Sequence, residues 1–172
     1  MLSDCRSFFA VPRSGAATGY GLYNVTFSGT NVLTTPTITY TSPLVIQNPA
    51  GTGTVTLAGT ITDTAMYPSS FTVKAGGRII DTASAPVAIT THGAPVVFNS
   101  STSGDSTSVT GGITLNGSIA TAGGNIYFGG GTAGNASGYS NAGSAASYTG
   151  TLSGIYLNGG SLNASGGDII LR

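Results

Sequence analysis

Acidic side chains are the residues of this chain best suited to chemistry, because two carboxylates can act as general acid and base on a polysaccharide. Asp63 and Asp81 are the closest pair among the five aspartates, and Lys74 and Arg78 lie between them. If the chain forms stacked coils, this pair falls on neighbouring coils. It is therefore the best candidate for the catalytic pair of a carbohydrate-active enzyme. The alternative, which we expect instead, is a solvated ion pair beside a loop.

Other reactive residues lack the partners that their chemistry needs. His92 has no partner that suggests a metal site or a triad, so we expect it at a surface corner. Residues 166–168 (Gly-Gly-Asp) are a fragment of a calcium-binding nonapeptide, but the repeat is not sustained. Cys5 is the single cysteine, which excludes an intrachain disulfide. We expect no catalytic site, no cofactor and no metal.

The composition is that of a neutral all-β domain. Only 6% of the 172 residues are charged, the formal net charge is zero, and 28 residues are glycine. A neutral chain has no electrostatic attraction for nucleic acid. No apolar run approaches the ~18 residues of a membrane helix, so we expect no membrane insertion. A surface built from Ser, Thr and Asn points to an extracellular or cell-surface location.

A long internal repeat organises the C-terminal half. Residues 112–128 recur as residues 154–171, at an offset of 42 that becomes 43 after the inserted Gly160. Self-similarity of this kind is typical of stacked structural units. The matched pairs are Ile113 with Ile155, Leu115 with Leu157, Asn116 with Asn158, Ile119 with Leu162, Ile126 with Ile169, and Phe128 with Leu171.

Each copy of the repeat reads as three short strands separated by two corners. Apolar and polar residues alternate in the strands, and Asn-Gly and Gly-Gly sequences mark the corners. This outline predicts one coil of a β-solenoid, which buries its apolar face only against coils above and below. We expect Asn116 and Asn158 to stack and hydrogen-bond, and Tyr127 and Tyr156 to face outward. The alternative is an antiparallel β-sandwich with Asn-Gly hairpins.

The rest of the chain carries weaker versions of the same pattern. Val55, Leu57 and Ile61 match the first half of the repeat, but the third strand, near Phe71, arrives three residues late. Further short strands are expected at 25–27, 37–40, 44–46, 78–80, 87–89 and 96–98. With ~20 residues per coil, we expect about six to eight coils.

We therefore divide the chain into two parts. Residues 1–20 form an irregular or partner-docking arm, and residues 21–172 form a single β-solenoid domain. Residues 129–150 are low in complexity and are expected to form a loop, because insertions in solenoids go there. The start of the chain is not a signal peptide and the end follows a strand directly, so we expect the chain to be a piece of a longer protein.

The repeat phrases in residues 95–172 resemble those of filamentous-haemagglutinin-type bacterial exoproteins, the adhesins exported by two-partner secretion. The resemblance implies a right-handed parallel β-helix on a cell surface. We expect a non-catalytic structural or adhesive segment of a large secreted protein, with a host-surface or glycan receptor. The alternative is a subunit of a self-assembling homopolymeric filament, joined end to end through open coil edges. A carbohydrate-active β-helix enzyme is the third hypothesis.

Overall fold

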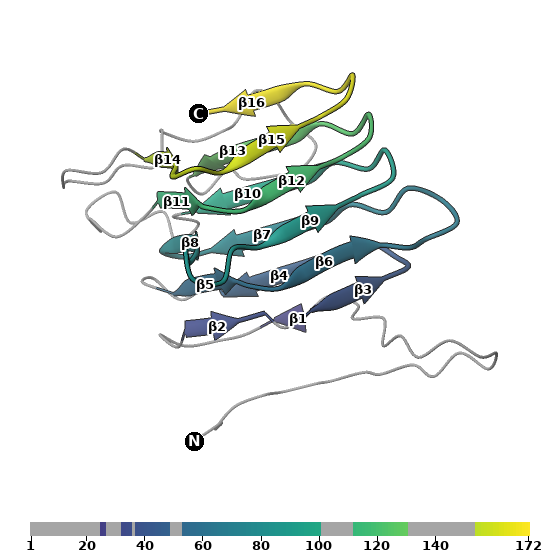
Figure 1. The fold of residues 1–172 in the computed structure, drawn as a ribbon. Coiled ribbons are helices and arrows are strands. Elements are labelled where there is room, and N and C mark those ends of the chain that lie inside the picture. The colour runs from purple at the N-terminus through teal and green to yellow at the C-terminus, as the bar shows by residue number, and fades with distance from the viewer. Residues whose placement is uncertain (1–24, 27–31, 36, 49–52, 101–111, 131–153) are drawn as a thin grey trace.

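The described part of the chain is built only from short β-strands. The computed structural model describes residues 25–26, 32–35, 37–48, 53–100, 112–130 and 154–172. These residues form sixteen strands and no helix (Figure 1). The strands are sorted by sequence order into three sheets, in which every third strand joins the same sheet.

The first sheet has six strands and the other two have five each. The six-stranded sheet contains β1 (Val25–Thr26), β4 (Leu44–Asn48), β7 (Phe71–Ala75), β10 (Val96–Ser100), β13 (Ile126–Gly130) and β16 (Ile169–Leu171). The second contains β2 (Val32–Thr34), β5 (Thr54–Leu57), β8 (Arg78–Asp81), β11 (Gly112–Leu115) and β14 (Ile155–Leu157). The third contains β3 (Ile38–Tyr40), β6 (Thr60–Asp63), β9 (Ala88–Thr90), β12 (Ser118–Ala120) and β15 (Ser161–Asn163).

Each coil takes one strand from each sheet, and successive coils stack on one another. β2, β3 and β4 make the first complete coil, and β14, β15 and β16 make the fifth (Figure 1). Every pairing between these strands is parallel. The fold is thus a right-handed parallel β-helix, as predicted, and the antiparallel sandwich is wrong because a sandwich requires antiparallel neighbours.

The internal repeat lies in register on the top two coils. Ile113 is paired with Ile155 on parallel strands, and Ile119 is paired with Leu162. These pairings confirm the alignment made from the sequence. The weaker copy at Val55 belongs to the same sheet, but Ile79 lies between it and Ile113, so the two are two coils apart rather than adjacent.

The coils differ in length, which corrects the expected number of coils. Leu33, Val55, Ile79, Ile113 and Ile155 are successive register partners, separated by 22, 24, 34 and 42 residues. The two longest coils include residues 101–111 and 131–153, which are outside the described part. Because the coils are longer than expected, the chain has room for fewer of them. The described chain has five complete coils and β1 instead of six to eight.

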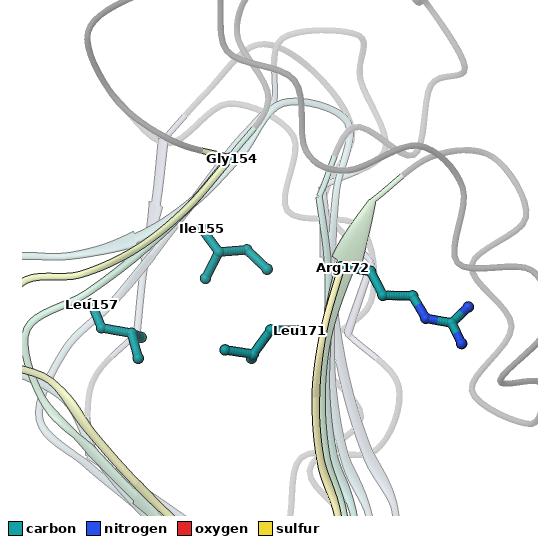
Figure 2. A pocket seen from close by; sticks show the side chains of 5 residues that line it. All are labelled: Gly154, Ile155, Leu157, Leu171 and Arg172. Carbon is teal, nitrogen blue, oxygen red and sulfur yellow. The ribbon is translucent and has the colours of Figure 1, made fainter.

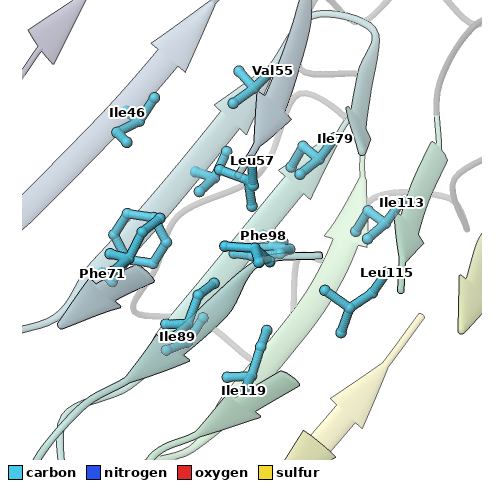
Figure 3. Close-up of a cluster of buried hydrophobic side chains, with 14 of the residues drawn as sticks. Ile46, Val55, Leu57, Phe71, Ile79, Ile89, Phe98, Ile113, Leu115 and Ile119 are labelled. Carbon is cyan, nitrogen blue, oxygen red and sulfur yellow. The ribbon is translucent and has the colours of Figure 1, made fainter. Parts of the chain in front are cut away.

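The core is a set of side-chain columns that run along the solenoid axis (Figure 3). Inward residues alternate with outward ones because successive side chains of a strand point to opposite faces. Phe98 and Phe128 are register partners in one column and stack at 4.8 Å between ring centroids, and Phe71, in the neighbouring column, meets Phe98 edge to face at 6.3 Å. Burying each such ring stabilises the fold by about 1.5–3 kcal/mol.

Several smaller expectations have separate outcomes. Tyr127 and Tyr156 alternate with inward residues and face outward, as predicted; Tyr156 is 40% exposed. The expected loop at 129–150 starts too early, because Gly129 and Gly130 belong to β13 and pair with Asn99 and Ser100. The remainder of that loop and the arm at 1–20 lie outside the described residues.

Candidate functional site

Asp63 closes the longest described corner between the third sheet and the six-stranded sheet. It ends β6 and is fully buried. One carboxylate oxygen, Oδ1, accepts a 2.9 Å hydrogen bond from the Ala65 N–H, and Oδ2 accepts a 2.9 Å bond from the Ser69 N–H. A buried carboxylate is stable only when its oxygens are paired, and here both oxygens hold the backbone of the corner that follows.

The coils above use threonine where this coil uses Asp63. Strand register places Asp63 below Thr91, which in turn lies below Thr121. The Thr91 hydroxyl donates a 2.6 Å bond to the Ala94 carbonyl, and the Thr121 hydroxyl donates to the Gly124 carbonyl. Four residues follow Thr91 or Thr121 before the next strand begins, whereas seven residues, 64–70, follow Asp63. One hydroxyl closes a short corner, and the two oxygens of a carboxylate reach both ends of a long one.

Tyr40 supports the same corner from the coil below. It is the register partner of Asp63 and is fully buried. Its hydroxyl donates a 3.1 Å hydrogen bond to the Ser69 carbonyl, and its own carbonyl accepts a 2.9 Å bond from the Thr64 N–H. Burial, and secondarily the nearby Asp63 carboxylate, raise the pKa of the Tyr40 phenol, because both disfavour a phenolate.

The tip of this corner carries the two most exposed large apolar side chains of the described residues. Met66 is 91% exposed and Tyr67 is 77% exposed. The Ser69 hydroxyl donates a 3.3 Å bond back to the Tyr67 carbonyl. Figure 1 shows the β6–β7 connection extending outward beyond the corners of the coils above it. The delayed strand at Phe71 was the signal for this corner in the sequence, but no pattern of residues indicated that Met66 and Tyr67 are exposed at its tip.

Asp81 has a comparable structural role on a different sheet. Its Oδ1 accepts hydrogen bonds from the backbone N–H of Asn116 (2.6 Å) and from the Asn116 side-chain amide (2.9 Å). Its Oδ2 accepts bonds from the N–H groups of Gly117 (2.8 Å) and Val87 (3.1 Å). The carboxylate therefore joins its own corner to the corner of the coil above.

The structure does not bring the candidate catalytic residues together into one groove. Asp63 ends a strand of the third sheet and Asp81 ends a strand of the second, and backbone N–H groups bind both oxygens of each. Lys74 lies on β7 in the six-stranded sheet, and Arg78 begins β8 in the second. Each of the four carboxylate oxygens thus already accepts at least one backbone hydrogen bond.

The other residues singled out in the sequence also lie at corners. His92 is exposed in the corner between β9 and β10. Asp168 lies in the corresponding corner of the fifth coil, where its N–H donates a 2.8 Å bond to the Asn125 side chain of the fourth coil. Among the described residues no group of three or more His, Cys, Asp or Glu side chains is placed to hold a metal ion.

A second feature is an open apolar hollow at the last coil. It has a volume of about 360 Å³ and is lined by Gly154, Ile155, Leu157, Leu171 and Arg172. Figure 2 shows the three aliphatic side chains directed into the hollow, while the guanidinium of Arg172 points away from it. Leu171 is 44% exposed. These side chains occupy the positions that face inward in the coils below, so the hollow is the open top of the core.

Comparisons with known proteins identify no relative of this chain. No protein-family model, no curated protein and no solved structure matches the chain. Across the residues that the structure describes, no helix is long and apolar enough to span a membrane.

Proposed function

We propose that this chain is a non-catalytic, extracellular structural and adhesive segment of a large secreted surface protein or fibre. The observation that carries the proposal is the in-register stack of five coils. A stack grows by adding coils without changing its core, which suits a protein that must extend from a surface. The resemblance of residues 95–172 to filamentous-haemagglutinin-type repeats supports the same function.

The bonding of the two buried aspartates supports the non-catalytic part of the proposal. A glycosidase needs one carboxyl group that donates a proton and one that attacks or activates water. In Asp63 and Asp81, the carboxylate oxygens instead accept hydrogen bonds from backbone N–H groups. Both residues hold corners in place. Corners are the parts of a solenoid that accept insertions without loss of the core.

Binding to cells tests the adhesive function directly. Fluorescently labelled, folded chain is applied to cultured epithelial cells over a range of concentrations, and bound fluorescence is measured by flow cytometry. The proposal expects saturable binding that unlabelled chain displaces. As a control, the same labelled chain unfolded by heating shows only background fluorescence. Binding that does not saturate, or that the unfolded control reproduces, contradicts the adhesive function.

A second function, self-assembly into a filament, is favoured by the exposed top of the core. β14, β15 and β16 are each the last strand of a sheet in the described chain, and Ile169 and Leu171 on β16 are about half exposed. Unpaired strand edges are templates for further pairing. Sedimentation at increasing protein concentration tests this function, since a filament gains mass with concentration. A constant monomer mass up to millimolar concentration contradicts it.

A further inference from the structure

We propose that residues 64–70, hereafter the tip loop, are the contact site through which the solenoid binds a partner protein that has an uncharged apolar pocket. The proposal deepens the adhesive function and rests on it. The two side chains that enter the partner are Met66 and Tyr67. The proposal follows from three properties of the tip loop: its length, its rigid support and the side chains it displays.

The tip loop interrupts an otherwise regular column of corners. At the same place in the stack, three residues join β3 to β4, and five residues join β9 to β10, β12 to β13, and β15 to β16. Of the five described coils, only the second has seven. A solenoid does not need the additional residues to complete its coil, because the coils above and below close with fewer. Insertions on one face of a solenoid are commonly its binding elements.

The backbone on both sides of the tip is fixed by buried groups. On the entering side, Asp63 holds the Ala65 N–H and the Tyr40 carbonyl holds the Thr64 N–H. On the leaving side, the other oxygen of Asp63 holds the Ser69 N–H. A loop that is already ordered loses little conformational entropy when it binds. The fold thus uses a fully buried carboxylate to present an ordered tip.

The coil above also supports the tip loop. The Cγ atom of Pro68 lies 3.8 Å from the position that a β-carbon would take at Gly93, so Pro68 packs over the corner of the third coil. Proline also fixes its own φ angle. Met66 and Tyr67 are therefore held outward between two anchored positions, Ala65 and Pro68.

The chemistry of the tip favours a protein partner over a glycan. Sugars are recognised through several polar groups, but two of the hydroxyl groups in the tip loop are already bound to backbone carbonyls. The Thr64 hydroxyl donates to the Tyr40 carbonyl at 3.3 Å and the Ser69 hydroxyl donates to the Tyr67 carbonyl. None of the seven residues is charged. Methionine and tyrosine, in contrast, are enriched in protein–protein interfaces, where they fill apolar pockets.

The test uses the cell-binding measurement with two altered tip loops. In the first variant, Met66→Ser and Tyr67→Ser remove the apolar side chains and keep the loop length. In the second, residues 63–70 are replaced by the Thr-His-Gly-Ala-Pro corner that the third coil uses at the same position. The matched control is Tyr156→Ser, which removes an exposed tyrosine from β14. This strand belongs to the second sheet, whereas the tip loop joins the third sheet to the six-stranded sheet. Circular dichroism and thermal unfolding verify that all the variants fold.

The expected result is that both tip variants raise the half-saturating concentration on cells about ten-fold or more, while Tyr156→Ser leaves it unchanged. Prior treatment of the cells with trypsin abolishes binding, and periodate oxidation of surface sugars does not. Full binding by the folded tip variants overturns the proposed contact site and leaves the adhesive function standing. Loss of binding after periodate alone identifies a glycan receptor and overturns the protein partner. Absence of binding by the unaltered chain overturns both the adhesive function and this proposal.

Discussion

The side-chain amide of Asn158 donates a 2.7 Å hydrogen bond to the side-chain oxygen of Asn116, one coil below it. The Asn116 amide in turn donates a 2.9 Å bond to the carboxylate of Asp81, a further coil down. Three successive corners are thus joined by a column of polar side chains outside the core. Such a column fixes the register of the coils, because a shift by one residue breaks each of its bonds.

Asp81→Ala is expected to destabilise the fold by about 2–4 kcal/mol, because it leaves three backbone N–H groups without their acceptor. Those groups belong to Val87, Asn116 and Gly117. The matched control, Asn158→Ala, removes the exposed end of the same column and is expected to cost less than about 1 kcal/mol. Urea unfolding followed by circular dichroism measures both. Equal losses for the two variants are incompatible with a central role for Asp81.

Gly117→Ala is expected to cost about 3 kcal/mol through crowding of the coil below. A β-carbon at this position lies 1.9 Å from the Val87 carbonyl oxygen, which is backbone and cannot rotate away. Gly159→Ala is the comparison, because a β-carbon there meets no atom within 4 Å and the residue has a φ of +77°. Its cost is therefore only the conformational one, about 1 kcal/mol. The same unfolding measurement ranks the two, and a larger loss at Gly159 contradicts the close stacking of the corners.

Phe98→Ala is expected to destabilise the solenoid by about 3–5 kcal/mol, since the cavity removes the ring that packs against both Phe71 and Phe128. Phe98→Leu keeps most of the volume and is expected to cost less than about 1.5 kcal/mol. Leu171 already occupies the equivalent position of the fifth coil, paired with Phe128. Thermal unfolding of both variants checks the expectation. A leucine variant as unstable as the alanine variant argues against a packed column at this position.

At alkaline pH, Tyr40→Phe is expected to lose less stability than the wild type does. The folded chain raises the pKa of Tyr40, above the value of about 10 that the unfolded chain has. The protonated phenol therefore contributes its full stability below about pH 10. Above that pH the unfolded chain loses the proton first, and the contribution falls until the pH passes the folded pKa.

Unfolding free energies of the wild type and Tyr40→Phe, measured between pH 7 and 11.5, give the comparison. The difference between the two proteins is expected to be constant up to about pH 10 and then to shift against the wild type. The other tyrosines titrate in both proteins and cancel. A constant difference across the whole range shows that the Tyr40 pKa is not raised in the folded state.

Sequence reasoning identified the strands where the repeat is strong. The alignment of Ile113 with Ile155 placed both on parallel strands, and the bond between Asn116 and Asn158 was expected from equal corner positions. Alternation of apolar and polar residues is a local signal, so it survives in the weaker coils. The strand Val32–Thr34 was missed because only two apolar residues mark it; its register with β5, which depends on the assembled stack, is what defines it.

The tip loop and the role of the aspartates were harder to foresee. The sequence separates Asp63 and Asp81 by 18 residues, and the prediction that they lie on neighbouring coils is confirmed, since β6 belongs to the second coil and β8 to the third. The structure places each at the end of a strand in a different sheet, and their oxygens accept local backbone N–H groups. A sequence does not distinguish a structural carboxylate that caps a corner from a catalytic one. Only the hydrogen bonds distinguish them.

The most direct measurement of the central claim is a set of interstrand proton–proton contacts in solution. Nuclear Overhauser effects on isotope-labelled protein are recorded between the backbone protons of β11 and β14. The stacked solenoid predicts contacts of Ile113 with Ile155, Thr114 with Tyr156 and Leu115 with Leu157, which ascend in the same order along both strands. Contacts that pair Ile113 with Leu157 and Leu115 with Ile155 show antiparallel strands and contradict the account, as does the absence of any contact between these two strands.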